Sequence, residues 1–360
     1  MLDQVFVLVM AGGVGSRLWP KSRNSLPKQF LNVTGKETLI QTTVRRILPI
    51  VSPDHIFVAT GERYVDIVQA QLPDLPKQNI IAEISGKNTA PAIGLGAIHI
   101  SQVNPEATMV VLTADHIIPD EEAFRNALLA AIEVAQTGRF ATLGVSPTGP
   151  DTGFGYIHRG QTVGQFQNQD VFTVQRFLEK PDLSTAQEFF ASGDYYWNSG
   201  MFIWRISDLL AAFQAHMPQF YKQLELLRSA IFDETSSESV REIWDQVTSV
   251  SIDFGLMEYM TNVAVVPLDA GWNDVGNWAA LYQELAENGA DNVAVNAEHM
   301  AVDSQRVMIQ GNGKLVATIG LEDVVIVETD DVILVCKMDK TQDVKKIVET
   351  FKQEKRANYL

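Results

Sequence analysis

The feature that most constrains this chain is an apolar run that leads directly into a glycine-rich loop. Residues Val5 to Met10 are apolar without interruption, which is typical of a parallel strand buried on both faces of a sheet. Gly12, Gly13 and Gly15 follow at once, and a residue without a Cβ lets a ligand approach the backbone closely. This order predicts an α/β fold with a ligand site beyond the end of its first strand.

Basic residues gather just beyond the glycines. Arg17, Lys21, Arg23 and Lys28 lie in a stretch, from residue 5 to residue 35, that contains no Asp or Glu. The whole chain has 44 acidic and 28 basic residues and a formal net charge of −16, so the loop contrasts with an acidic background. A basic, glycine-rich loop after a buried strand predicts a polyphosphate site.

A plain turn with solvated basic side chains is the alternative explanation of this loop. The dinucleotide-binding pattern is incomplete, because the segment from Gly13 to Leu18 lacks its third glycine. The P-loop pattern does not fit either, because no Gly-Lys-Ser/Thr sequence ends the loop. Glycine spacing alone leaves both explanations open.

Strands and helices alternate through the first 145 residues. We expect buried strands at residues 55–60, 79–83, 108–115 and 140–145, and helices at residues 38–47, 62–71, 88 onward and 121–136. The alternation predicts a doubly wound, mostly parallel, Rossmann-like sheet. Ligands bind such sheets beyond the carboxyl ends of the strands, so the glycine loop, Glu83 and Asp115 would meet at one edge.

With 360 residues, the chain is long enough for one large domain and a smaller one. From about residue 291 the pattern changes to short strands, expected at residues 292–296, 301–303, 306–309, 315–319, 323–327 and 331–336, before a helix from 341 to about 355. We therefore expect an α/β domain over residues 1–285 and a β-rich domain over residues 286–360. No strict hexapeptide repeat is present, so the periodicity by itself does not predict a β-helix.

Four short strings between residues 150 and 285 carry much of the polar and aromatic content of that region. They are Thr152–Ile157, Phe177–Pro181, Trp197–Phe202 and Trp272–Trp278. Most of them combine glycine with polar and aromatic residues. This composition is more typical of turns that line a ligand than of packed core.

Composition and local pattern exclude several classes of protein. The acidic balance argues against non-specific nucleic-acid binding, which needs a basic surface. One cysteine, Cys336, excludes an intrachain disulfide and a multi-cysteine zinc site. No secretory signal and no apolar stretch of about 18 to 20 residues is present. We therefore expect a cytoplasmic protein that does not bind membranes.

Two aspartates stand where a metal could be held. Asp115 follows a buried strand, and Asp274 lies between Trp272 and Gly276. Mg²⁺ takes few protein oxygens and completes its shell with phosphates and water, so this pair fits a magnesium site. A helix or turn cap is the alternative role for Asp115. The neighbouring His116 is as well explained by a structural role as by a catalytic one.

The ordered set of motifs resembles a known family. The opening string Gly12-Gly13-x-Gly15-x-Arg17-Leu18-x-Pro20 with Pro27-Lys28 is similar to the signature of sugar nucleotidyltransferases. The later strings narrow the resemblance to the mannose-1-phosphate guanylyltransferases, also called GDP-mannose pyrophosphorylases. They are Asn88-Thr-Ala-Pro-Ala-Ile, Ala114-Asp-His, Thr152-Gly-Phe-Gly-Tyr, Phe177-x-Glu-Lys-Pro, Trp197-Asn-Ser-Gly-Met-Phe, Ser251-Ile-Asp-Phe-Gly-Leu-Met-Glu and Trp272-x-Asp-Val-Gly-x-Trp.

The resemblance implies a nucleotidyltransferase domain, a β-helix-like C-terminal domain and a defined reaction. GTP and mannose 1-phosphate would give GDP-mannose and pyrophosphate, through Mg²⁺-assisted in-line attack of the sugar phosphate on the α-phosphorus. Arg17 would hold the β- and γ-phosphates, and Lys28 would stabilise charge at the α-phosphate. Asp115 and Asp274 would hold Mg²⁺.

The remaining implied roles concern binding of the two substrates. Gly12, Gly13 and Gly15 would let the main chain approach the nucleotide, and Glu83 and Asn88 would read guanine. The implied sugar-phosphate contacts are Gly155, Glu179, Lys180 and Asn198, with Lys180 on the phosphate. Two departures from the family pattern occur: Thr113 stands where proline is usual, and Ile84 replaces a common proline.

Two rival hypotheses remain at this point. A uridylyl- or thymidylyltransferase for glucose 1-phosphate would keep the fold and change base and sugar. A sensor that binds sugar nucleotides without turnover is the second alternative. The presence of all four candidate catalytic residues, Arg17, Lys28, Asp115 and Asp274, argues against it. Some family members carry an additional phosphomannose isomerase domain; this chain ends at Leu360, so we expect no isomerase activity. The apolar strands of the C-terminal domain suggest a homodimer.

Overall fold

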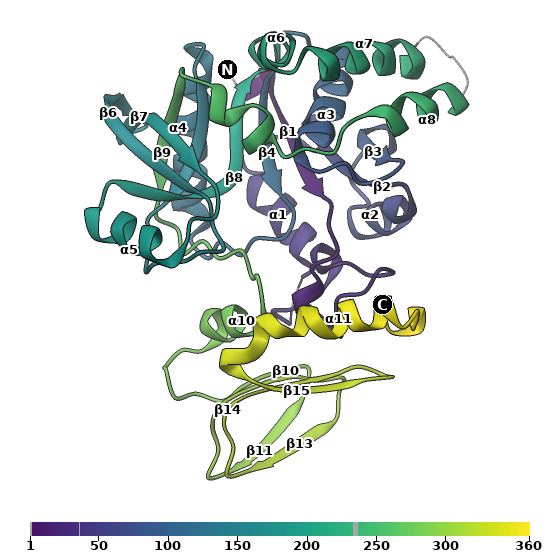
Figure 1. Cartoon of the computed structure of the whole chain (residues 1–360), viewed down its shortest axis with the longest axis vertical. Coiled ribbons are helices and arrows are strands. Elements are labelled where there is room, and N and C mark those ends of the chain that lie inside the picture. The colour runs from purple at the N-terminus through teal and green to yellow at the C-terminus, as the bar shows by residue number, and fades with distance from the viewer. Residues whose placement is uncertain (1, 36, 233–236) are drawn as a thin grey trace. The chain divides into compact units, whose positions relative to one another are not determined.

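The computed structural model describes residues 2–35, 37–232 and 237–360, and Figure 1 draws the chain. Contacts between residues divide it into two compact units, each assembled from separate segments. Unit 1 comprises residues 1–12, 44–113 and 118–272, and unit 2 comprises residues 13–43, 114–117 and 273–360. Most of the glycine loop therefore shares a unit with the C-terminal part of the chain. The domain boundary expected at residues 285/286 stays a prediction.

Unit 1 is built around one nine-stranded sheet. Its strands are β1 (Val5–Ala11), β2 (Ile56–Gly61), β3 (Ile80–Glu83), β4 (Thr108–Thr113), β5 (Phe140–Val145), β6 (Tyr156–Phe166), β7 (Gln169–Leu178), β8 (Tyr195–Arg205) and β9 (Val263–Leu268). Their spatial order is β3-β2-β1-β4-β8-β5-β9-β7-β6. Strands β1 to β4 are parallel neighbours, as are β5 and β9. Strand β8 lies antiparallel between β4 and β5.

Helices cover this sheet. In unit 1 they are α2 (Val65–Gln71), α3 (Thr89–Val103), α4 (Glu121–Gln136), α5 (Leu183–Ser192), α6 (Ile206–His216), α7 (Pro218–Phe232), α8 (Ser237–Gln246) and α9 (Ile252–Gly255). Helix α3 packs against β1 and β2, and α4 packs against β5, β8 and β9. The doubly wound, mostly parallel sheet predicted from the alternation is confirmed.

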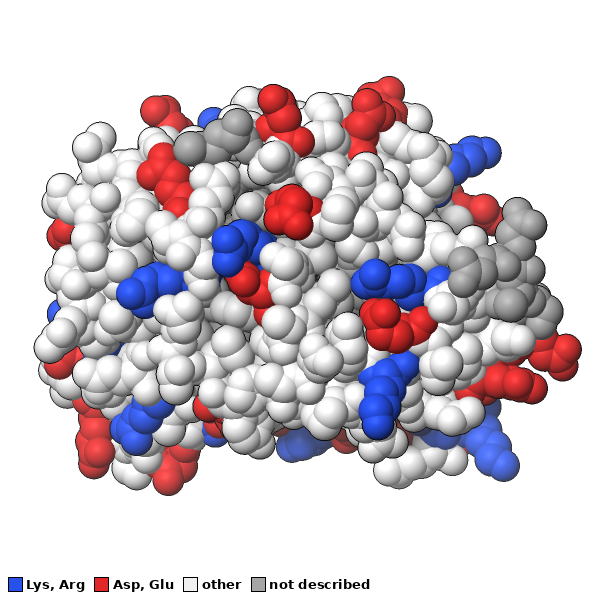
Figure 2. All heavy atoms as spheres, turned by 90° about the horizontal axis from the view of Figure 1, so that it is seen from above, with Lys and Arg blue, Asp and Glu red and all other residues white. Residues whose placement is uncertain are grey.

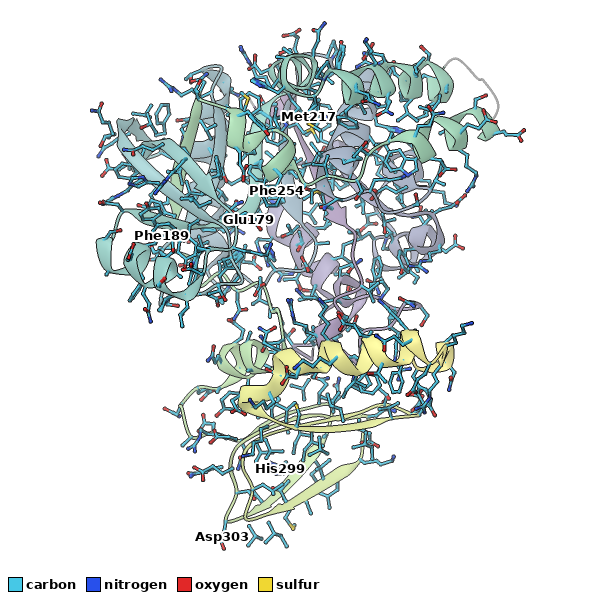
Figure 3. The ribbon with its side chains drawn as sticks, in the orientation of Figure 1. Glu179, Phe189, Met217, Phe254, His299 and Asp303 are labelled. Atoms are coloured by element: carbon cyan, nitrogen blue, oxygen red, sulfur yellow. The ribbon has the colours of Figure 1, made fainter. Side chains whose placement is uncertain are left out.

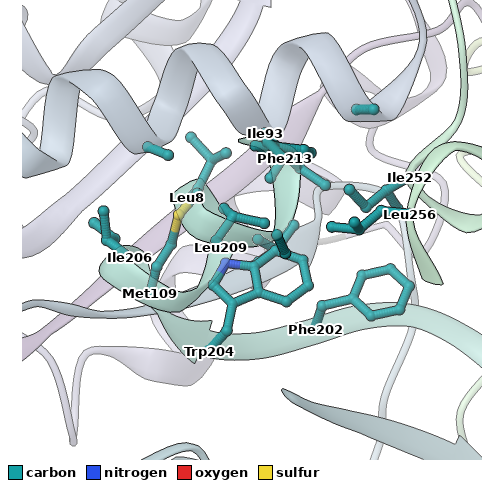
Figure 4. Packing of buried hydrophobic residues seen from close by; sticks show 14 of the residues in the cluster. Leu8, Ile93, Met109, Phe202, Trp204, Ile206, Leu209, Phe213, Ile252 and Leu256 are labelled. Carbon is teal, nitrogen blue, oxygen red and sulfur yellow. The ribbon is translucent and has the colours of Figure 1, made fainter. Parts of the chain in front are cut away.

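The core of unit 1 lies between the sheet and helices α3, α6 and α7. Alternate residues of β1, such as Phe6 and Leu8, point into a cluster with Ile93 of α3 and Trp204 of β8. Figure 4 shows Leu8, Ile93 and Trp204 side by side with Phe213 of α6. Every residue of α3 from Ala90 to Ile98 is buried, because this helix has the sheet on one side and other helices on the other.

The structure corrects three details of the predicted elements. Strand β4 ends at Thr113 rather than at Asp115, which lies in the turn that follows. The string Trp197–Phe202 lies inside β8 and not in a turn. Its positions alternate between buried and half-buried from Trp197 to Met201, and Phe202 is buried as well. The strand expected at residues 301–303 is β11 (Glu298–Val302).

Unit 2 contains a two-sided coil of parallel strands. These are β10 (Val293–Val295), β11, β12 (Gln305–Gln310), β13 (Leu315–Ile319) and β14 (Glu322–Glu328), with β15 (Ile333–Lys337) antiparallel to β14. From β10 to β14, successive strands alternate between the sheet β10-β12-β14-β15 and the pair β11-β13. Gln305 pairs with Glu322, so one coil takes 17 residues. This coil explains why no strict hexapeptide period is visible, and the β-helix-like prediction is confirmed.

Two helices of unit 2 cover the larger sheet of this coil, α10 (Trp278–Leu285) and α11 (Val344–Gln353). Their buried side chains join residues of the glycine loop in one apolar cluster, which includes Leu18, Trp19, Trp278, Val344 and Val348. Helix α1 (Leu39–Ile47) begins in unit 2 and ends in unit 1. The glycine loop is therefore packed on the C-terminal helix.

Candidate functional site

The glycine loop is held in shape by contacts of its own backbone. Gly15 has φ +73°, and a Cβ placed there would lie 2.5 Å from the Cβ of Lys28. Only glycine combines this left-handed backbone with such a close approach. The Lys28 N–H donates to the Val14 carbonyl at 3.2 Å, and the Gln29 side-chain amide donates to the Gly13 carbonyl at 3.3 Å.

Gly12 and Gly13 differ from Gly15, because a Cβ on either would meet no atom within 4 Å. Gly12 ends the first segment of unit 1, after β1, and Gly13, with φ +82°, begins the first segment of unit 2. The protein itself therefore leaves open space beside both residues. The sequence predicts that a nucleotide would use this space.

A cavity of about 370 Å³ lies within unit 2 beside the loop. It contains four residues of the predicted site: Arg17, Lys28, Asp115 and Asp274. The other lining residues are Gly15, Ser16, Leu18, His116, Val275, Gly276 and Lys345. Residues from distant parts of the sequence thus meet at one place.

Lys28 is the buried centre of this cavity, with a relative exposure of 5%. Its ammonium group donates to the Asp115 carboxylate at 2.8 Å and to the backbone carbonyl of Asp274. It therefore links the turn that follows β4 to the Trp272–Trp278 string. The second carboxylate is held as well, since the Gly276 N–H donates to Asp274 Oδ1 at 3.0 Å.

The charge of Asp115 is maintained in spite of its surroundings. Burial by itself would raise the pKa of this carboxyl, but Lys28, followed by His116, brings the pKa below its usual value. Asp115 is therefore ionised at neutral pH, as a metal ligand or a partner of a cation must be. His116 Nε2 lies 3.9 Å from Asp115 Oδ1 and is buried.

Arg17 presents a charge that the fold does not neutralise. It lies on the short helical turn Ser16–Leu18 and is exposed in the cavity. Within residues 2–35, 37–232 and 237–360, no hydrogen bond or ion pair engages its guanidinium group. A guanidinium group can bind phosphate oxygens through two parallel hydrogen bonds, so Arg17 is well suited to an anionic ligand.

The segment after Asp274 has an unusual backbone. Val275 is completely buried and has φ +47°, a conformation that costs energy for a β-branched residue. The Asn273 side chain holds this turn by accepting from the Val275 N–H at 2.8 Å. Such strain is characteristic of functional sites, and here it lies next to a predicted metal ligand.

The donor set of the cavity fits a hard divalent cation that also binds phosphate. Asp115 and Asp274 supply carboxylate oxygens to the same cavity, and Mg²⁺ sites commonly use one or two carboxylates plus substrate phosphates. In the part of the chain that the structure describes, no group of three or more His, Cys, Asp or Glu forms a metal cage. An ion held by these two carboxylates would complete its shell with water or with phosphate oxygens.

A second group of predicted residues meets within unit 1. A Cβ on Gly155 would collide with the Glu179 carboxylate and would lie 3.4 Å from Asn198 Cβ. The Asn198 N–H donates to the Gly155 carbonyl at 2.8 Å, and Lys180 forms an ion pair with Glu179. Glu179 follows β7 and is labelled in Figure 3. All four predicted sugar-phosphate residues are therefore close together.

Asn198 is oriented from both ends of its side chain. Its amide oxygen accepts from the Gly200 N–H at 3.1 Å, and its amide nitrogen donates to Asp253 Oδ1 at 2.7 Å. One N–H and one lone pair then remain for a ligand. Burial, with the nearby Glu179 charge, raises the pKa of Asp253. The cluster therefore contains two carboxyl groups and an amide, which are groups that can form hydrogen bonds with hydroxyls.

Glu83 and Asn88 lie between β3 and α3, where the sequence predicts guanine contacts. Glu83 ends β3 and is 6% exposed, and burial raises the pKa of its carboxyl to about 7. Asn88 is the N-cap of α3 and is exposed, and its side chain accepts from the Thr89 N–H at 2.9 Å. Its φ of +72° is unusual for a residue with a side chain.

Sequence reasoning missed two residues of these clusters. Lys345 lines the cavity from α11, but its sequence context is an ordinary amphipathic helix that gives no signal. Asp253 lies in the string Ser251–Glu258 that helped identify the family resemblance. Its position two residues after the helix cap Ser251 could have suggested a separate role, because Ser251 already accepts from the Phe254 N–H at 3.3 Å.

Two further observations concern nucleic-acid binding and membrane-spanning helices. On the face shown in Figure 2, Lys and Arg side chains alternate with Asp and Glu side chains. This face therefore lacks the continuous basic track that nucleic-acid binding uses. Among the described residues, none of the helices has the length and apolar character to span a membrane.

Two family models match the chain in sequence. The nucleotidyl transferase model matches residues 6–290, and the model of the MannoseP isomerase/GMP-like beta-helix domain matches residues 297–351. Together they account for both parts of the fold, since the first covers the nine-stranded sheet and the second covers most of the coil of unit 2.

Similar proteins carry consistent names. The mannose-1-phosphate guanylyltransferase of Escherichia coli (strain K12) is 39% identical over 362 residues, which cover 99% of this chain and 75% of that protein. The mannose-1-phosphate guanylyltransferase RfbM of Salmonella typhimurium (strain LT2) is 40% identical over 357 residues, covering 98% and 73%. A Thermus thermophilus crystal structure, described as a mannose-1-phosphate geranyltransferase, has TM-score 0.87 and 32% identity and covers 97% and 99%. The chain belongs to the mannose-1-phosphate guanylyltransferase family of nucleotidyl transferases.

Proposed function

We propose that this chain transfers GMP from GTP to α-D-mannose 1-phosphate and releases pyrophosphate, with GDP-mannose as the product. The observation that carries the proposal is the cavity of unit 2. It combines the unpartnered guanidinium group of Arg17, the buried ammonium group of Lys28 and the carboxylates of Asp115 and Asp274, in a chain about 40% identical to guanylyltransferases of this name.

The reaction asks the protein for positioning and charge neutralisation, without a covalent intermediate. Arg17 would bind the β- and γ-phosphates, and Lys28 would stabilise the charge that develops at the α-phosphate. The phosphate oxygen of the sugar substrate would attack the α-phosphorus, and the bond to pyrophosphate would break opposite the attacking oxygen. Gly12, Gly13 and Gly15 would let the main chain approach the nucleotide, with open space beside Gly12 and Gly13.

Nucleotidyl transferases of this kind generally use a divalent metal, and Mg²⁺ is our specific proposal. Asp115 and Asp274 would hold it. When bound, such an ion neutralises phosphate charge and polarises phosphoryl oxygens. The ionised state of Asp115 at neutral pH supports this role.

The cluster in unit 1 would bind the second substrate. Gly155, Glu179 and Asn198 would contact mannose hydroxyls, and Lys180 would contact the sugar phosphate. Asp253 would act through Asn198, whose amide it orients at 2.7 Å. Glu83 and Asn88 would read guanine, because an ionised Glu83 can accept hydrogen bonds from guanine N1–H and the 2-amino group.

Three further statements belong to the proposal. We propose a cytoplasmic enzyme, without nucleic-acid or membrane partners, that forms a homodimer. Sedimentation of the purified chain tests the dimer.

The experiment that tests the function is a substrate panel with pyrophosphate release as the readout. Each of GTP, UTP, dTTP, CTP and ATP is paired with mannose 1-phosphate and glucose 1-phosphate. We expect GTP with mannose 1-phosphate to give the highest kcat/KM. A preference for UTP or dTTP with glucose 1-phosphate would support the rival transferase instead, and no turnover of any pair would support the sensor hypothesis.

An aspartate variant tests the metal proposal. Asp274→Ala should lower kcat by about a hundredfold or more, because electrostatic stabilisation of the reacting phosphates is lost. Asp74→Ala, in an exposed turn, is the matched control and should behave as wild type. An unchanged rate in Asp274→Ala would refute the metal role of this residue.

A further inference from the structure

We propose that Lys345, on the C-terminal helix α11, is a third phosphate-binding cation of the active site and contacts the pyrophosphate part of the nucleotide. The inference rests on the proposed function of the cavity. It assigns to the β-helix part of the chain a direct role in substrate binding, in addition to its packing.

The position of Lys345 is fixed by its neighbours on the helix. Val344 and Val348 are buried in the cluster that also contains Leu18 and Trp19 of the glycine loop. The loop is tied to the C-terminal segment as well, because Trp19 Nε1–H donates to the Tyr359 carbonyl at 2.7 Å. Helix α11 is therefore packed against the loop, and Lys345 lines the same cavity as Arg17.

The charges of the cavity favour a third cation. The triphosphate of GTP carries about four negative charges at neutral pH, and Asp115 and Asp274 add two more. Lys28 is already engaged by Asp115 and by the Asp274 carbonyl. A divalent ion, Arg17 and Lys28 together do not balance the negative charges of the triphosphate and the two aspartates. The charge of Lys345 brings the net charge of the occupied cavity closer to zero.

The present partner of Lys345 can be displaced by a phosphate. Its ammonium group lies 3.5 Å from Glu349, and the two side chains are 55% and 49% exposed. Exposed pairs of this i,i+4 type stabilise a helix by only about 0.3 to 0.5 kcal/mol. Because a phosphate group carries more charge than a carboxylate, Lys345 would exchange Glu349 for the nucleotide without disturbing the helix.

The test compares Lys345→Ala with Lys346→Ala. Lys346 is the next residue of the same helix, pairs with Asp343 at 2.8 Å and does not line the cavity, so it is a matched control for charge. We expect Lys345→Ala to raise KM for GTP, and for pyrophosphate in the reverse reaction, by about fivefold, the effect of one exposed charge contact. KM for mannose 1-phosphate and the melting temperature should stay as in wild type.

Two further variants make the result unambiguous. Lys345→Arg should restore both KM values to within about twofold of wild type, because it keeps the charge. Lys345→Gln should resemble Lys345→Ala. The proposal fails if Lys345→Ala matches Lys346→Ala, or if KM for mannose 1-phosphate rises as much as KM for GTP.

A binding measurement separates this inference from the proposed function. Titration calorimetry with pyrophosphate and Mg²⁺ depends on the phosphate cavity and not on which base or sugar the enzyme uses. Weaker pyrophosphate binding by Lys345→Ala, in an enzyme that makes no GDP-mannose, would keep the role of Lys345 and refute the proposed function. Equal binding by wild type and Lys345→Ala would refute the role of Lys345 alone.

Discussion

At the scale of single residues, the glycines of the loop have two different reasons to be glycine. Gly15 is required by the fold, because its backbone is left-handed and Lys28 lies against its Cα. Gly12 has open space around it, so the fold alone does not explain it. The difference can be measured, since a fold requirement changes stability and a ligand requirement changes binding.

Alanine variants of Gly15 and Gly12 should therefore differ in which property changes, the stability or the binding of GTP. Gly15→Ala should lower the free energy of unfolding by about 1 to 3 kcal/mol, through strain and the contact with Lys28. Gly12→Ala should change it by no more than about 0.5 kcal/mol but raise KM for GTP. Denaturant unfolding and steady-state kinetics measure both. A destabilised Gly12→Ala, or a Gly12→Ala with wild-type KM, would remove the ligand-based explanation.

Glu83 is a second residue that lowers the stability of the folded chain, because its carboxyl group is buried. Its pKa is about 7 in the folded chain against an ordinary value of 4.5. Between pH 4.5 and pH 7 the folded chain keeps a proton that the unfolded chain has lost, so the free energy of unfolding falls as the pH rises through this window. The total loss is about 3 kcal/mol above pH 7.

Glu83→Gln should reverse this loss and impair recognition of guanine. At pH 8 the variant should be more stable than wild type by up to about 3 kcal/mol, and at pH 5 the excess should be small. Wild-type KM for GTP should decrease between pH 6 and pH 8 as Glu83 ionises, whereas the variant should lack this dependence. Thermal unfolding and pH-dependent kinetics provide the two measurements. Parallel pH profiles of wild type and variant would contradict the guanine role.

At the scale of elements, the short helix α9 illustrates how one segment supports another. Ser251 caps α9, so Asp253 in its first turn is free of the capping role and instead contacts Asn198 on β8. The side chain that faces the proposed sugar is thus positioned by an element more than fifty residues later in the chain. Phe254 of the same helix is labelled in Figure 3.

Removal of the Asp253 carboxylate should weaken the binding of mannose 1-phosphate and leave the binding of GTP unchanged. Asp253→Ala should raise KM for mannose 1-phosphate by about five- to tenfold, which corresponds to the loss of one typical hydrogen bond of about 1 kcal/mol. KM for GTP should remain unchanged. Asp253→Asn keeps an acceptor for Asn198 and should stay within about twofold of wild type. Equal losses for both substrates would indicate a general structural role for Asp253.

At the scale of the whole molecule, the sequence predicts most elements and fails where tertiary packing decides. Helix α4 and strand β5 begin and end where their patterns predict, at Glu121–Gln136 and Phe140–Val145. The prediction is wrong for Trp197–Phe202, because its polar and aromatic composition hides the period-two burial of a strand. A local sequence pattern predicts local structure only. In β8 the conformation is determined by pairing with the neighbouring strands, which the pattern does not contain.

The candidate site also contains some residues that the sequence could predict and others that it could not. Arg17, Lys28, Asp115 and Asp274 could be singled out because each lies next to glycines, a buried strand or tryptophans, and the structure brings all four to one cavity. Lys345 could not be predicted, since its position follows from the packing of α11 on the loop. The grouping of the glycine loop with the C-terminal residues in one unit also depends on contacts that no short motif encodes.

The central claim is that the chain moves GMP from GTP onto mannose 1-phosphate, and the most direct test follows the label of the α-phosphate. GTP labelled at the α-phosphate is incubated with the enzyme, Mg²⁺ and mannose 1-phosphate, and a parallel sample carries the label at the γ-phosphate. We predict that the α-label appears in GDP-mannose, that the γ-label appears in pyrophosphate, and that the protein remains unlabelled. An α-label that stays in GTP, or that becomes bound to the protein, would contradict this account.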